Sequence, residues 1–210
     1  MLLRLSERTV RYTVAILICL ASANCSQTDP VYDRIRSDTG LLEWEGVHQL
    51  IRGDFPTVPT VTTDQLAEAL MAGQPVILLD TRDASEFLVS HLPEARLVRS
   101  TSDLIASLKD VSPDTLIVAY CSVGYRSAKL IQELQQRGIT TAFNLEGSIF
   151  AWANAGLPIY RENSQVRQVH PFNESWGQLL KPELWAFAPT EEQSLNNPHH
   201  TSMDSHQPSR

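Results

Sequence analysis

The chain has 210 residues and carries 17 Lys+Arg against 24 Asp+Glu, a net charge of −7 at pH 7. An acidic protein does not attract the phosphate backbone, so this balance argues against a nucleic acid as a partner. The three cysteines, Cys19, Cys25 and Cys121, have no spacing typical of a disulfide framework or a zinc site.

Residues 1–23 have the pattern of a targeting segment. Thr13–Leu20 is an apolar core that follows several arginines, and Ala21–Ala23 offers small residues for cleavage. The core is short for a membrane span, which needs about 20 apolar residues. We therefore expect an export signal and an extracytoplasmic (periplasmic) protein that meets a membrane only through its N-terminus. The alternatives are an uncleaved anchor, or a lipid anchor on Cys25.

Residues 24–58 form a connector with one predicted amphipathic helix. Over Leu41–Gly53, the side chains of Trp44, Val47 and Ile51 recur on one helical stripe, and Gly53 is typical of a helix end. The charged residues of this helix do not form the basic face that a membrane surface attracts. We expect the helix to pack on the main domain.

Residues 59–161 alternate between strand and helix patterns. Apolar runs typical of buried strands are followed by segments with helical periodicity, which predicts an α/β fold with a central parallel β-sheet and helices on both faces. Asp83 and Glu86 have the spacing of a capping box at one helix start. The predicted elements are Asp64–Ala72, Pro75–Asp80, Leu97–Val98, Leu104–Leu108, Leu116–Tyr120, Ser127 to Gly138, Thr140–Asn144 and Ile149–Ala155.

The turn between the strand Leu116–Tyr120 and the following helix holds Cys121, in the sequence CSVGYR. Such a turn directs backbone N–H groups and the positive end of the helix at what it encloses. A helix N-terminus and a nearby cation, here Arg126, lower the pKa of a thiol from its usual value of about 8.5. We interpret Cys121 as a reactive thiolate; the alternative is a buried, inert cysteine that happens to follow a strand.

Three blocks in this region resemble the rhodanese family of sulfurtransferases. The loop and helix start CSVGYRSA resembles the family's active-site loop, with its Cys nucleophile, mid-loop Gly and Arg-Ser. Ile77–Ala95 is similar to the family's strand, Asp-x-Arg, Glu-Phe and His-hydrophobe-Pro segment, and Asn144–Pro158 to its closing block. The blocks lie in the family's order within residues 59–161 and indicate a single-domain form. Together with the N-terminal segment, they indicate an exported member of the family.

The resemblance implies a sulfurtransferase that moves a sulfane sulfur from thiosulfate or a persulfide donor to a thiophilic acceptor. The Cys121 thiolate would carry the sulfur as a persulfide, a covalent intermediate. The acceptor would be cyanide, a thiol or a cysteine of another protein, and no metal or organic cofactor is needed. The residues expected to bind the substrate are Ser122, Val123, Gly124, Tyr125, Arg126 and Ser127.

Two further positions in the blocks are candidates for supporting roles. Asp80 and Arg82 end a predicted strand at the carboxyl edge of the sheet, where a scaffold role as an ion pair is favoured over a chemical one. His91 could act as a general base, but we expect it to pack and hydrogen-bond within its turn, since a thiolate that is already formed needs no base.

The sequence departs from the family pattern at four positions. Ser122 stands where many thiosulfate-using members carry a second Arg, so binding of an anionic donor would depend mainly on Arg126. Ser90, Glu94 and Ser148 replace glycines, which affects turn geometry more than chemistry. These departures leave the natural donor open.

Two other functions remain as alternatives. Phosphatases and arsenate reductases use related loops to bind oxyanions, but their Arg generally follows the Cys by six residues, whereas Arg126 follows Cys121 by five. A non-catalytic rhodanese-type binding module is the second alternative, although inactive members usually lack the Cys.

The C-terminal residues change in character. Residues 162–189 form an aromatic extension with Trp176, Leu180 and Trp185, which is too apolar to be free in solution and is expected to wrap the core or cover a partner surface. Residues 190–210 are polar without apolar periodicity and are predicted to be a disordered tail.

Overall fold

The computed structural model describes residues 30–35 and 42–190. The chain divides into two units at Asp33 and Arg34, and the short helix α2 (Pro30–Asp33) belongs to the first. The second unit begins at Arg34 and contains the remaining helices and strands. The predicted signal segment, and all but the first residue of the predicted tail, lie outside the described residues. No helix in the described part of the chain is long and apolar enough to cross a membrane.

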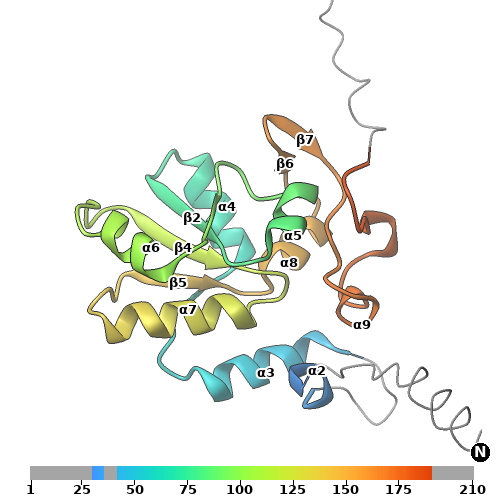
Figure 1. The fold of residues 1–210 in the computed structure, drawn as a ribbon, viewed down its shortest axis with the longest axis horizontal. Helices are drawn as coiled ribbons and strands as arrows, with labels where there is room; N and C mark the ends of the chain where they lie inside the picture. The colour runs from blue at the N-terminus through green and yellow to red at the C-terminus, as the bar shows by residue number, and fades with distance from the viewer. Residues whose placement is uncertain (1–29, 36–41, 191–210) are drawn as a thin grey trace, which may run out of the picture. The chain divides into compact units, whose positions relative to one another are not determined.

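A five-stranded parallel sheet forms the centre of the fold, in the order β1-β5-β4-β2-β3. This confirms the predicted α/β class with a central parallel sheet, and Figure 1 shows the helices that flank it, with α6 and α7 together on one side. The strands are β1 (Thr60–Val61), β2 (Val76–Asp80), β3 (Arg96–Leu97), β4 (Leu116–Tyr120) and β5 (Ala142–Leu145). The helices around them are α3 (Trp44–Asp54), α4 (Thr63–Met71), α5 (Ala84–Val89), α6 (Thr101–Leu108), α7 (Tyr125–Gln136) and α8 (Ser148–Asn154).

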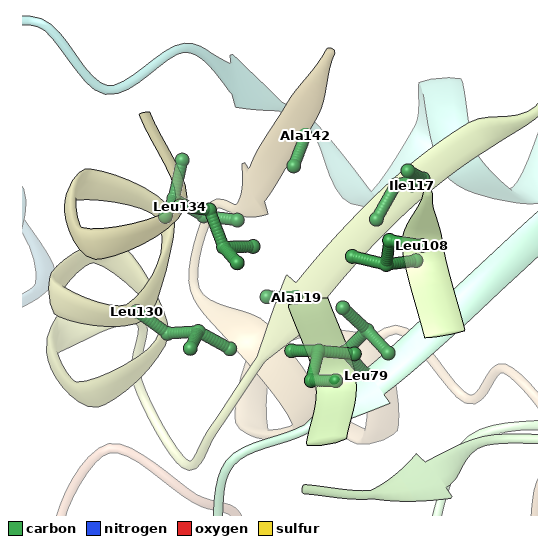
Figure 2. Packing of buried hydrophobic residues seen from close by; sticks show 9 residues of the cluster. Leu79, Leu108, Ile117, Ala119, Leu130, Leu134 and Ala142 are labelled. Carbon is green, nitrogen blue, oxygen red and sulfur yellow. The ribbon is translucent and has the colours of Figure 1, made fainter. Parts of the chain in front are cut away.

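The two central strands are buried on both faces. Leu79, Ile117 and Ala119 point to one face, where leucines of α6 and α7 meet them (Figure 2). Their neighbours Leu78 and Val118 point to the opposite face by the alternation of a strand and are equally buried. Burial on both faces explains why these strands read as continuous apolar runs in the sequence.

The register of the two central strands places their ends side by side. Asp80, the last residue of β2, is paired with Tyr120, the last residue of β4. Residues that follow β2 and β4 therefore share the carboxyl edge of the sheet, where open α/β folds bind their ligands.

The C-terminal extension packs against the domain. A hairpin of β6 (Ile159–Arg161) and β7 (Ser164–Val166) leads into α9 (Glu174–Gly177) and a 3₁₀ turn, η1 (Pro182–Leu184). The Asn154 side chain at the end of α8 donates to the carbonyl of Leu179 at 2.8 Å and accepts from the N–H of Lys181 at 2.9 Å. The apolar side chains buried in this extension are Val166, Val169, Trp176, Leu179, Leu180, Leu184 and Ala186.

We expect Leu180→Ala to destabilise the protein by about 2–5 kcal/mol, because it would leave a cavity beneath the extension. Leu180 is only 2% exposed. Met71→Ala is the matched control, since Met71 is 87% exposed and should change the stability by less than about 0.5 kcal/mol. Urea unfolding followed by tryptophan fluorescence measures both. Equal midpoints for the two variants would mean that the extension adds nothing to the core.

Candidate functional site

The loop Cys121–Arg126 joins the end of β4 to the start of α7 and encloses the sulfur of Cys121. The N–H of Gly124 donates to Cys121 Sγ at 3.1 Å. Gly124 has φ +112°, and a Cβ there would lie 3.3 Å from Ile51 Cδ1. Only glycine therefore fits this point of the turn without strain. Gly124 is the residue just before α7, and α7 begins at Tyr125, two residues before the start at Ser127 that the apolar periodicity predicts.

The surroundings of Cys121 lower the pKa of its thiol. The residue is 1% exposed, and burial alone would raise the pKa of its thiol. The charge of Arg126 and the backbone N–H groups of Ser127, Gly124 and Val123 outweigh burial, so the pKa lies below the ordinary thiol value. The predicted binding residues Val123, Gly124 and Ser127 thus act on the sulfur through their backbones.

The start of α8 holds the backbone of Cys121. The Cys121 N–H donates to Ser148 Oγ at 3.1 Å, and this hydroxyl donates to the Leu145 carbonyl at 3.2 Å. The N–H of Ile149 donates to the Cys121 carbonyl at 3.2 Å. Both polar groups of the Cys121 backbone are therefore hydrogen-bonded, which restrains the position of its sulfur.

The side chain of Asn144, at the carboxyl end of β5, braces the loop from the other side. Asn144 Oδ1 accepts from the Ser127 hydroxyl at 2.6 Å, and its amide nitrogen donates to the Gly124 carbonyl at 3.1 Å. The sequence indicated Asn144 as the last residue of a strand and the first of the closing block that resembles the family, but assigned it no contact with the loop. Its position opposite Ala119 in the sheet register brings it beneath the loop.

Arg126 is paired with a buried carboxylate, Glu86 of α5. Two of its nitrogens donate to the Glu86 oxygens at 2.8 Å each, and the Ser122 hydroxyl donates to the same carboxylate at 2.9 Å. Burial of Glu86 would raise its pKa, but the bonds and charge of Arg126 hold it below the ordinary value. The sequence identified Glu86 as a capping residue and as part of the family's Glu-Phe segment, but not as the partner of Arg126. Glu86 does also accept the Asp83 N–H at 2.9 Å, as the capping box predicts.

Tyr125 points away from the sulfur. Its hydroxyl donates to Asp54 Oδ2 at 2.8 Å, at the end of α3, and its ring contacts Phe55 edge to face at 5.1 Å between centroids. Asp54 in turn pairs with Arg34 at 2.7 Å. The helix predicted over Leu41–Gly53 is α3 (Trp44–Asp54), and it contacts the outer end of the loop through Asp54.

Asp80 and Arg82 form a fully buried ion pair at 2.7 Å. Arg82 also donates to the Ser90 carbonyl at 2.6 Å, and its guanidinium lies 5.7 Å from the centre of the Tyr120 ring. The pair ties the end of β2 to the turn after α5. This geometry is that of a scaffold, because neither side chain reaches solvent.

His91 is occupied in packing. Its ring stacks on Phe87 at 4.3 Å, and Nδ1 lies 2.9 Å from the Leu92 carbonyl. Its backbone exchanges hydrogen bonds with Tyr160 of the C-terminal hairpin. Among residues 30–35 and 42–190, no three His, Cys, Asp or Glu side chains gather as a metal ion would require.

The C-terminal extension reaches the site through Phe172. The Phe172 ring lies over the Arg126 guanidinium, 5.0 Å from Cζ to the ring centre. The sequence predicted that the extension would wrap the core or cover a partner surface, but not that it would meet the active-site loop. Contacts between residues so far apart in the chain leave no local pattern.

Two of the glycine replacements keep the backbone that glycine favours. Glu94 has φ +53° and Ser148 has φ +49°, both in the left-handed region. Ser148 offsets this strain with its two hydrogen bonds beneath Cys121. Ser90 differs, because its φ of −169° is ordinary extended backbone.

Comparisons with known proteins agree with this geometry. The model of the Rhodanese-like domain matches residues 62–155. A protein named "Sulfurtransferase" from Allochromatium vinosum is 32% identical over 103 residues, which are 49% of this chain and 94% of that protein. The thiosulfate sulfurtransferase GlpE of Vibrio cholerae is 27% identical over 93 residues, 44% of this chain and 87% of that protein.

Other relatives are much longer than the shared region. "Probable adenylyltransferase/sulfurtransferase MoeZ" of Mycobacterium tuberculosis is 32% identical over 57% of this chain, but the match spans only 32% of that protein. Among solved structures, a rhodanese-like domain protein from Staphylococcus aureus is 30% identical, with a TM-score of 0.39 over 45% of this chain and 91% of that chain. Because nearly the whole Allochromatium protein aligns at this identity, and the Rhodanese-like domain match over residues 62–155 includes the strand, loop and helix around Cys121, the chain belongs to the rhodanese-like sulfurtransferase family.

Proposed function

We propose that the protein transfers a sulfane sulfur from thiosulfate or a persulfide donor to a thiophilic acceptor through a persulfide on Cys121. One observation carries the proposal: the buried Cys121 sulfur accepts the Gly124 N–H at 3.1 Å and has a lowered pKa at the start of α7. A thiolate held in this way is a nucleophile at neutral pH without help from a separate base.

In the first step the Cys121 thiolate attacks the outer sulfur of the donor. A new S–S bond forms, and the donor's own bond to that sulfur breaks. Its electron pair leaves with sulfite or a thiolate, so charge and electrons balance. The anionic outer sulfur of the persulfide would then be stabilised by N–H groups of residues 122–126, in the manner of an oxyanion hole.

In the second step an acceptor removes the outer sulfur. Cyanide, a thiolate or the cysteine of another protein attacks it, and the Cys121 thiolate leaves in its original state. Splitting the transfer into two displacements at sulfur means that donor and acceptor need never be bound together.

The phosphatase and arsenate reductase alternative has less support. Such enzymes need the guanidinium of the loop Arg to clamp an oxyanion. Here both terminal nitrogens of Arg126 are held by Glu86 at 2.8 Å. The Arg is therefore engaged with a carboxylate of the protein itself.

Cys121→Ser should abolish persulfide formation, because a serine hydroxyl has no comparable anion at neutral pH. Intact mass spectrometry after incubation with a sulfane-sulfur donor should show the gain of one sulfur atom in the parent protein and none in the variant. Ser122→Ala is the matched control at the next position, since it keeps the nucleophile and should still gain the sulfur. Transfer at the parent rate by the Cys121 variant would disprove the mechanism.

Arg126→Ala should lower kcat/KM roughly ten- to hundredfold at neutral pH, the loss expected for one charge-assisted contact. Arg126 favours the thiolate, so its removal raises the pKa of Cys121. The acid limb of the pH–rate profile should then move to higher pH, and part of the loss should be recovered as the pH rises.

Arg126→Lys is the control for this prediction. It keeps the positive charge but cannot hold Glu86 through two parallel hydrogen bonds. The pH profile of the Lys variant should stay close to that of the parent. A profile that does not move in the Ala variant would mean that Arg126 shapes the loop without affecting the thiol.

We also propose that residues 1–23 direct export. The apolar core Thr13–Leu20 and the small residues before Asn24 support this. N-terminal sequencing of the protein from its native host should find a start near Asn24, or a blocked, acylated Cys25. In the second case Cys25→Ser should release the protein from membranes. An intact Met1 on cytoplasmic protein would contradict the proposal.

A further inference from the structure

Phe172 lies outside the matched domain, yet its ring covers the face of the active-site arginine. The domain match ends at residue 155, and the Phe172 ring centre is 5.0 Å from Arg126 Cζ. The positive charge of Arg126 in turn lowers the pKa of the Cys121 thiol. The Phe172 ring therefore contacts the same guanidinium whose charge acts on the Cys121 sulfur. Phe172 is 37% exposed, so part of its ring faces solvent.

The backbone of Phe172 is held in a strained conformation. Its φ of +66° is unusual for a bulky residue, and the His170 imidazole accepts its N–H at 3.0 Å. The segment is anchored by Val169, which is fully buried and exchanges hydrogen bonds with Leu184 and Ala186. Strain of this kind persists where surrounding contacts impose it, and it often marks a ligand site.

The charges around Arg126 disfavour a doubly negative donor. Glu86, and Asp83 at 3.9 Å, carry two negative charges against the one positive charge of Arg126, a net of −1 for these three side chains before any charge on Cys121 is counted. The Arg126 guanidinium has only five N–H groups, and it already donates three hydrogen bonds, two to Glu86 and one to the Ser122 hydroxyl. A small dianion meets repulsion and few free donors.

We propose that Phe172 is a specificity-determining residue that selects a sulfane-sulfur donor with one negative charge and an apolar substituent. The inference rests on the proposed sulfur transfer and narrows its donor class. An organic thiosulfonate has this chemistry. Cys121 attacks its outer sulfur, the S–S bond breaks, and the sulfinate leaves with the electron pair. The substituent of the donor would lie against the exposed part of the Phe172 ring. An aromatic substituent would contact this ring edge to face or in an offset stack, the arrangements that aromatic pairs prefer.

Three donors with the same type of S–S bond test this. Thiosulfate is a dianion, methanethiosulfonate is a monoanion with a methyl group, and benzenethiosulfonate is a monoanion with a ring. We expect kcat/KM of the parent protein to be highest for benzenethiosulfonate and lowest for thiosulfate. Phe172→Ala should lower the value for benzenethiosulfonate by about two- to tenfold and change that for methanethiosulfonate little. Phe172→Tyr, which keeps the ring, should retain the parent ratio.

The outcomes separate this inference from the function on which it rests. If the parent prefers thiosulfate, or if Phe172→Ala lowers kcat/KM equally for all three donors, Phe172 does not select the donor, although sulfur transfer stands. If the parent takes sulfur from none of the donors, the proposed function itself fails. The donor order of the parent is measured without any variant, so a variant that folds poorly does not remove the test.

Discussion

The ion pair between Glu86 and Arg126 is the interaction on which the rest of the site depends. A buried carboxylate is costly unless charged partners satisfy it, and Arg126 and the Ser122 hydroxyl do so here. The same pair fixes where the positive charge lies relative to the Cys121 sulfur. Because one guanidinium serves the carboxylate, the thiolate and the Phe172 ring, changes at any of the three should affect the other two.

Segments on both sides of the matched domain complete the site. The helix α3 contacts the loop through Ile51 and Asp54, and the C-terminal extension contacts it through Phe172. The two segments also meet each other, since the Leu42 N–H donates to the side chain of Gln178 at 3.4 Å. The rhodanese-like domain thus supplies Cys121 together with Glu86, Asn144 and Ser148 around its loop, and the added segments supply further contacts through Ile51, Asp54 and Phe172.

Ser148 shows how a departure from a family pattern can be accommodated. A residue other than glycine at φ +49° is strained, but the hydroxyl gains two hydrogen bonds, one of them to the N–H of the nucleophile. The predicted effect on turn geometry is therefore accompanied by a direct contact with Cys121. The side chain that replaces the glycine has become part of the support for the loop.

The sequence by itself determined the strand, loop and helix around Cys121. The spacing of apolar residues, a glycine in the middle of the loop and a glycine at the helix end are all signals carried by neighbouring residues. The parallel sheet followed from the alternation of such units. Only the tertiary structure decided which distant side chains meet this loop. Glu86 lies 40 residues from Arg126 in the chain, and Asn144 lies 20 residues from Gly124. Phe172 joins them from beyond the domain. Their positions depend on strand order and on packing between elements, which no periodicity along the chain records.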